Sequence, residues 1–144
     1  MCLFGNLMSA GIIIFLSALV IATLGLLHLI YTFRGPKLAP RTVEVRAAME
    51  SDSPGISGQT TMWNAWVGFN ASHSLGAILF GLVYGYLALA YPQLLFASVF
   101  LSAVGLAMLT ALLFLAKRYW FSIPFRGIAV ALFLFVAGQI VARV

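Results

Sequence analysis

The most restrictive feature of this sequence is the length of its uncharged stretches. Residues 1–33, 53–116 and 127–142 contain no Asp, Glu, Lys or Arg. A soluble domain has about 25% charged residues, whereas this chain has 8% and is 63% apolar or aromatic. With one Cys, 13 Gly and 5 Pro in 144 residues, the composition also excludes a disulfide scaffold, a collagen and a disordered chain. The pattern therefore predicts an integral membrane protein.

The uncharged stretches divide into four spans, because a helix needs about 20 apolar residues to cross a bilayer. The longest stretch exceeds one crossing, and Tyr91-Pro92-Gln93 interrupts it, since proline cannot continue a helix interior. Ser122 and Pro124 suit the start of the last span, as a cap and an early helical proline. The four expected spans cover, in order, residues 9–33, 62–91, 94–116 and 124–142. We expect one all-α membrane domain over residues 1–144, a polytopic four-helix transmembrane bundle.

The basic residues predict the orientation of this bundle. Seven of the eight lie in the loops at 34–61 and 117–126, which an even number of spans places on one side, opposite both termini. By the positive-inside rule these loops are cytoplasmic and both termini are outside. The net charge of +5 then reflects topology, so we expect the lipid bilayer and no nucleic acid as a partner. Residues 1–33 lack the basic n-region of a signal peptide, which indicates a span and not a cleaved signal.

The second span carries rows of small residues at four-residue spacing. Gly68-Ser72-Gly76 forms one row, and Ala77-Gly81-Gly85 forms another that contains a true Gly-x-x-x-Gly. Such rows let helix backbones approach closely in lipid. We therefore expect this helix to be central in the bundle. The same faces are candidates for contact with a homo-oligomer or a membrane-protein partner.

Polar residues within the spans are few and gather near the 34–61 loop. His28 and Thr32 are i, i+4 neighbours at the end of the first span, while Trp66, Asn70 and His73 share one face of the second. At 1.5 Å per residue, His28 lies about 5 Å and His73 about 10 Å inside their aromatic belts. An ionisable residue in a membrane is a functional-site candidate. These five residues are the candidate ligand-binding residues.

Three roles are open for the two histidines, His28 and His73. As neutral side chains they can hydrogen-bond a facing helix. With Asn70 they can form a pocket for a small lipophilic ligand or substrate. They are also weak candidates for ligating haem iron or another metal, since helix bundles build such sites. The depth difference of about 5 Å between the two histidines, however, makes it awkward for both of them to ligate one haem. We expect no metal and no cofactor.

The residues and motifs that the sequence lacks argue against several activities. No Asp, Glu, Lys or Arg lies in a span away from its ends, which argues against proton-coupled exporters and excludes a carboxylate-rich di-iron site. Gly-x-Ser-x-Gly, His-Glu-x-x-His and phosphate-binding glycine motifs are absent from the sequence. We therefore expect a non-catalytic accessory, packing or lipophilic-ligand-binding protein. The alternatives are a membrane enzyme with His73 as acid/base and Asn70 orienting it, and a haem-binding redox protein that uses His28 and His73.

The 34–61 loop contains one further predicted element. Residues 42–50 can form a short amphipathic helix, with its apolar residues toward the membrane and Arg46 and Glu50 outward. A turn over residues 51–55 follows. The loop is either a connector at the membrane interface or a lid over the region of His28 and His73, because it joins the helices that carry them.

Several segments resemble a known family. The relevant residues are His28-Leu29-Ile30-Tyr31-Thr32-Phe33, Thr60-Thr61-Met62-Trp63, Ala65-Trp66-Val67-Gly68-Phe69-Asn70-Ala71-Ser72-His73-Ser74 and Tyr119-Trp120-Phe121-Ser122-Ile123-Pro124. They are similar to a family of uncharacterised small four-span bacterial integral membrane proteins, over nearly the whole chain. The resemblance implies four spans and a bacterial inner (plasma) membrane. It implies no activity.

Overall fold

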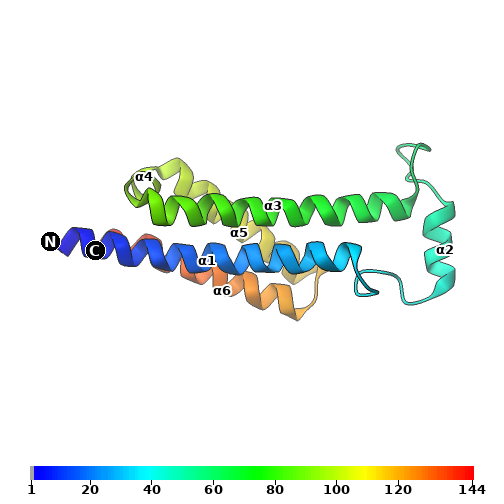
Figure 1. Ribbon diagram of the computed structural model, residues 1–144, viewed down its shortest axis with the longest axis horizontal. Coiled ribbons are helices and arrows are strands. Elements are labelled where there is room, and N and C mark those ends of the chain that lie inside the picture. Colours follow the sequence, from blue (N-terminus) through cyan, green and yellow to red (C-terminus); the bar gives the residue numbers. More distant parts are fainter. Residues whose placement is uncertain (1) are drawn as a thin grey trace. The chain divides into compact units, whose positions relative to one another are not determined.

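The computed structural model describes the backbone of residues 2–144 and the side chains from residue 5 onward, and this part of the chain is all-helical (Figure 1). Its helices are α1 (Cys2–Phe33), α2 (Val43–Ser51), α3 (Met62–Ala90), α4 (Pro92–Ala97), α5 (Val99–Tyr119) and α6 (Ser122–Val141). Four of them are long and apolar enough to cross a membrane, over Gly5–Phe33, Met62–Ala90, Val99–Tyr119 and Ser122–Val141. The prediction of an all-α, multi-pass membrane protein is confirmed.

The helix ends follow local sequence signals. Gly35 has a φ of 81° just after α1, a left-handed conformation that favours glycine and terminates helices. Thr61 precedes α3, and its hydroxyl accepts a hydrogen bond from the backbone N–H of Asn64 at 3.2 Å, as expected of an N-cap. Pro92 stands in the first turn of α4, where its missing N–H costs nothing. Glycine and proline therefore set the main helix boundaries.

Two predicted span boundaries were wrong. The first helix begins at Cys2 instead of residue 9, because nothing between these positions breaks a helix. The span expected at 94–116 is divided at Ser98, so that α4 ends at Ala97 and α5 runs on to Tyr119. Ser98 has extended backbone angles, and its side chain accepts a hydrogen bond from the N–H of Leu101. It therefore acts as the N-cap of α5, a role in which serine is favoured.

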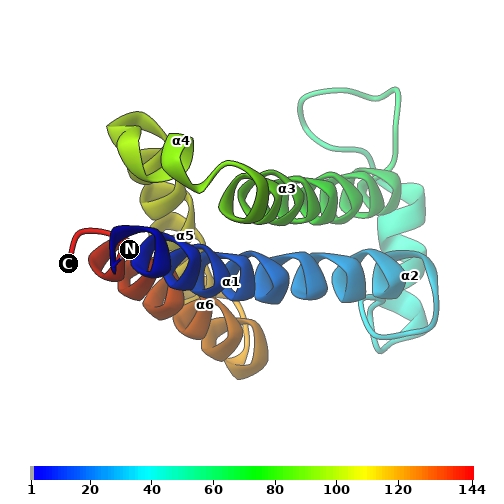
Figure 2. The same ribbon diagram turned by 60° about the vertical axis from the view of Figure 1, so that its left-hand side comes forward.

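The chain forms two compact units, each of which takes part of α1 and part of α3. One comprises the chain up to Leu24 together with Ala77–Val144, and the other comprises Gly25–Gly76. In the first unit, α1 (blue), α3 (green), α5 and α6 surround an apolar core (Figures 1 and 2). The side chains with under 2% exposure include Ile14, Ile21, Leu109 and Phe135.

Close helix contacts in the first unit depend on small residues. A Cβ added at Gly81 would lie 2.6 Å from the Cβ of Ala22 and 2.7 Å from the carbonyl oxygen of Ala18, so α3 reaches the backbone of α1 at this point. Gly85, one turn further, contacts Phe15. The row Ala77-Gly81-Gly85 is thus a packing face. The other row is different, because a Cβ at Gly68 or Gly76 would meet nothing within 4 Å.

The second unit, Gly25–Gly76, is built from the end of α1, the loop with α2, and the first half of α3. Here α2 ends at Ser51, and the backbone N–H of Met62 donates to the carbonyl oxygen of Asp52 at 2.9 Å. This bond holds the end of α2 to the start of α3. All five predicted site residues lie in this unit.

Candidate functional site

Asn70 and His28 form the polar centre of the second unit. The Nε2 of His28 lies 2.8 Å from the Oδ1 of Asn70, and the Nδ2 of Asn70 donates to the carbonyl oxygen of Trp66 at 2.8 Å. Because Nδ2 is engaged with Trp66, Oδ1 must face His28, and a carbonyl oxygen can only accept. His28 therefore donates from Nε2. Asn70 is 6% exposed, and it joins residues that are 42 positions apart.

His73 packs against the same histidine through its ring. The imidazoles of His28 and His73 meet edge to face, with centroids 5.5 Å apart and planes at 79°. Phe69 lies nearly parallel to His73, at 6.4 Å between centroids. From helix rise, the two histidines are expected to lie about 5 Å apart in depth; this stays a prediction, because a ring-to-ring distance does not measure depth in a bilayer.

Thr32 and Trp66 anchor the backbone around this centre. The hydroxyl of Thr32 donates to the carbonyl oxygen of His28, one turn earlier, at 2.8 Å. The Nε1 of Trp66 donates to the carbonyl oxygen of Leu38 at 2.9 Å. This second bond ties the loop after α1 to α3, across 28 positions of the sequence.

A cavity of about 260 Å³ lies beside these residues. Its walls include four aromatic side chains, two polar ones and one cation, which are Tyr31, Phe33, Trp63, Trp66, Thr32, Asn70 and Arg46. Neither histidine is among its lining residues. The structure thus brings Thr32, Trp66 and Asn70 to the cavity wall, while His28 is hydrogen-bonded to Asn70 and His73 packs on His28.

Two cations lie over aromatic rings of this wall. The Cζ of Arg46 is 3.3 Å from the ring centroid of Trp63, and the Nζ of Lys37 is 3.8 Å from that of Tyr31. Such contacts are attractive because the face of an aromatic ring is electronegative. The prediction that Arg46 faces outward from α2 was wrong, since it lies on Trp63 at the cavity wall.

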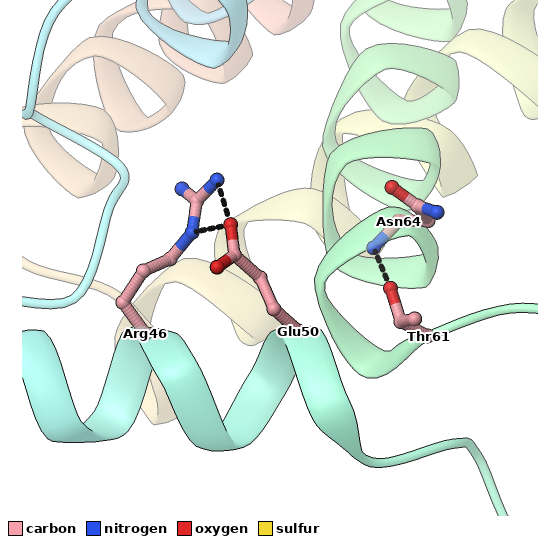
Figure 3. Close-up of polar contacts among 4 residues, drawn as sticks. All are labelled: Arg46, Glu50, Thr61 and Asn64. Carbon is pink, nitrogen blue, oxygen red and sulfur yellow. Dashed lines mark hydrogen bonds and ion pairs between the residues drawn. The ribbon is translucent and has the colours of Figure 1, made fainter.

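Glu50 holds the guanidinium of Arg46 in this position (Figure 3). Glu50 Oε1 accepts from Nε at 2.7 Å and lies 2.6 Å from Nη2. The two residues are one turn apart on α2, where opposite charges stabilise a helix. Among residues 2–144, this is the only ion pair that the structure describes.

Sequence reasoning missed Lys37, Arg46 and Leu38 as parts of the site. Trp66 was placed on the face of Asn70 by helical spacing, and Trp63, three residues earlier on the same helix, lines the cavity with it. Lys37 and Leu38 lie in a loop without periodicity, so no spacing rule relates them to Tyr31 or Trp66. Arg46 lies in a stretch, residues 34–62, that contains no aromatic residue, so no spacing rule relates it to Trp63 either.

The positions of His28, His73 and Asn70 bear on the two alternative functions, a membrane enzyme and a haem-binding redox protein. Asn70 orients His28, whereas the proposed acid/base was His73. A haem plane between the two histidines does not fit, because their rings are already in contact and Asn70 occupies the Nε2 of His28. Among the described residues, no three His, Cys, Asp or Glu side chains are grouped to hold a metal ion.

In comparisons with known proteins, no family model, no curated protein and no solved structure matches this chain. The residues of the cavity are therefore the basis for assigning a function.

Proposed function

We propose that this protein is a non-catalytic, multi-pass membrane protein that binds a lipophilic molecule in the cavity of the Gly25–Gly76 unit. The observation that carries the proposal is the cavity of about 260 Å³ with four aromatic side chains in its wall. Ligand sites in proteins are concave, largely apolar and aromatic, and contain a few placed polar groups. The wall of the cavity combines aromatic side chains with the polar groups of Thr32, Asn70 and Arg46.

The polar groups around the cavity support binding over catalysis. Asn70 uses both ends of its amide within the protein, and the hydroxyl of Thr32 and the indole N–H of Trp66 each donate to a backbone carbonyl. A general acid or base must reach the proton that it transfers, and neither histidine lines the cavity. Such groups shape and stiffen a pocket.

The aromatic residues suggest the depth of the cavity in the membrane. Tyr and Trp concentrate where the bilayer meets water, and Tyr31, Trp63 and Trp66 surround the cavity at the ends of two spans. A ligand there would be amphipathic, with its polar end at headgroup level. The basic loops favour the cytoplasmic face, and the resemblance to small bacterial proteins favours the inner membrane.

The proposal is tested by filling the cavity. Val67 lines it, so Val67→Trp should reduce binding of an oleoyl lysophospholipid about tenfold or more, because the indole occupies the ligand volume. Native mass spectrometry of the full chain in mild detergent measures the bound fraction. We expect wild type to retain one molecule per chain.

A matched control is Val83→Trp, on an exposed position of the same helix. It should bind as wild type does. Circular dichroism and a thermal melt establish that both variants are folded. Equal retention by a folded Val67→Trp variant and wild type would contradict the proposal.

A further inference from the structure

We infer that the ligand of this cavity is an amphiphile with an acidic headgroup, recognised by Lys37 and Arg46. The inference rests on the proposed function and specifies its ligand. Both cations lie over rings that form the cavity wall, Lys37 over Tyr31 and Arg46 over Trp63. Arg46 itself lines the cavity, and Lys37 lies against Tyr31 of its wall without lining it, so positive charge at this wall favours an anion.

Arg46 retains donors for a second acceptor. A guanidinium carries five N–H donors in a planar fork. Glu50 engages Nε and Nη2 through a single oxygen, Oε1. The other donors of the fork are then available to a carboxylate or phosphate oxygen, and stacking on Trp63 fixes the plane in which they point.

Lys37 carries a charge that no carboxylate neutralises among the described residues. Its ammonium group has three donors and is engaged by the face of Tyr31 alone. The 34–61 loop holds four basic and three acidic residues, and Glu50 is already committed to Arg46. An acidic headgroup would therefore find an uncompensated positive charge at the cavity.

The size of the cavity indicates how such a ligand would lie. Sites that enclose a drug-sized molecule measure about 300–1,000 Å³, so about 260 Å³ suits a headgroup with the first carbons of its chain. Phe33 lines the cavity and is 65% exposed. Its ring thus extends from the cavity to the outer surface and marks a path for the chain toward lipid.

The test compares headgroups on one acyl chain. Oleoyl lysophosphatidylglycerol and oleoyl lysophosphatidylcholine are titrated separately against the full chain in mild detergent, and Kd is measured by native mass spectrometry. We expect the acidic lipid to bind about tenfold more tightly, because both lipids present a phosphodiester but the choline lipid adds a quaternary ammonium that the two cations repel. Equal Kd values would overturn the inference and leave the proposed function intact. Absence of binding by both lipids would overturn both.

Variants of Lys37 and Arg46 test whether these two residues cause the preference for the acidic lipid. Lys37→Gln and Arg46→Gln should each remove most of the preference, by lowering the affinity for the acidic lipid more than the affinity for the zwitterionic choline lipid. Arg41→Gln makes the same charge change in the same loop, at an exposed residue that neither lines the cavity nor lies over an aromatic ring of its wall, and should retain the preference. If Arg41→Gln removed as much of the preference, the preference would arise from the total charge of the loop, and the assignment to Lys37 and Arg46 would be overturned.

Glu50→Gln provides a test that a structural role cannot mimic. Removing the carboxylate frees the Arg46 fork, so the affinity for the acidic lipid should rise severalfold although an ion pair is lost. A fall in affinity in this variant would overturn the inference.

Oleate and inorganic phosphate distinguish the possible sources of the anion. Oleate should compete with the acidic lipid, whereas phosphate, which has no apolar chain, should not compete at millimolar concentration. Displacement by phosphate as effective as by the lipid would overturn the assignment to an amphiphile.

Discussion

Among the described residues, the buried polar side chains are held by partners within the chain, except for the Nε2 of Gln139, which has no partner. Ser17 and Ser74 are fully buried, and their hydroxyls donate to the carbonyl oxygens of Ala131 and Asn70, at 2.6 and 2.7 Å. Hydrocarbon offers no hydrogen-bond partners, so each such group needs one from the protein. Asn70 satisfies this need for His28 as well as for itself, which makes it the residue on which the polar centre depends.

Asn70→Leu tests this dependence at similar side-chain volume. It leaves the Nε2–H of His28 without its acceptor, so we expect a loss of about 1–2 kcal/mol in the free energy of unfolding. Unfolding in mixed micelles with increasing SDS measures it. Asn64→Leu, at an exposed position of the same helix, should change stability by less than about 0.5 kcal/mol. Equal effects of the two substitutions would contradict the role given to Asn70.

At the scale of the helix, α3 has two rows of small residues with opposite environments. The row at Gly81 and Gly85 contacts α1, whereas Gly68 and Gly76 have no neighbour within 4 Å of an added Cβ. The two rows cannot be distinguished by sequence pattern, because both have small residues at four-residue spacing. Only the rotation of α3 about its axis determines which row meets another helix.

Gly81→Ala and Gly76→Ala should therefore have opposite effects. At Gly81 the new methyl group overlaps backbone of α1, which cannot move as a side chain can, and we expect a loss of about 1–3 kcal/mol. At Gly76 alanine is free of contact and improves helix propensity, so stability should be unchanged or rise by up to about 1 kcal/mol. The same unfolding assay measures both. Similar losses at the two positions would show that the Gly76 face is also packed.

At the scale of the whole molecule, we propose that the four candidate spans all cross the membrane, which would place both chain ends on one side of it. Within the first unit, α6 lies against the first part of α1. A Cβ added at Gly138 of α6 would contact Ile14 and would lie 3.2 Å from the carbonyl oxygen of Ala10. The start of α1 and the end of α6 therefore lie together. The basic residues of the loops favour the cytoplasm for the opposite side.

Single cysteines test this topology. In a Cys2→Ser background, Val144→Cys should react with a membrane-impermeant maleimide in sealed, right-side-out vesicles, because the proposed orientation places it outside. Gln59→Cys, in the basic loop, should react only after the membrane is permeabilised. Gel mobility after labelling reports both. The reverse pattern would contradict the orientation, and identical accessibility would contradict the four-span topology.

The number of spans and their approximate limits were determined by the sequence alone. Charges are costly in hydrocarbon, so a stretch without them is a property of the chain that needs no knowledge of its neighbours. The helix face with Trp63, Trp66 and Asn70 was also predictable, since it depends on helical periodicity only.

Tertiary structure decided which of these residues meet. Helices as apolar as α1 and α3 have no strongly polar face to fix their rotation, and their axial register depends on how side chains interlock. The bond between His28 and Asn70, the approach of Gly81 to α1, and the placement of Lys37 and Arg46 on aromatic rings all follow from rotation and register. Periodicity within one helix carries no information about either, and the cavity of the Gly25–Gly76 unit became visible only in the packed structure.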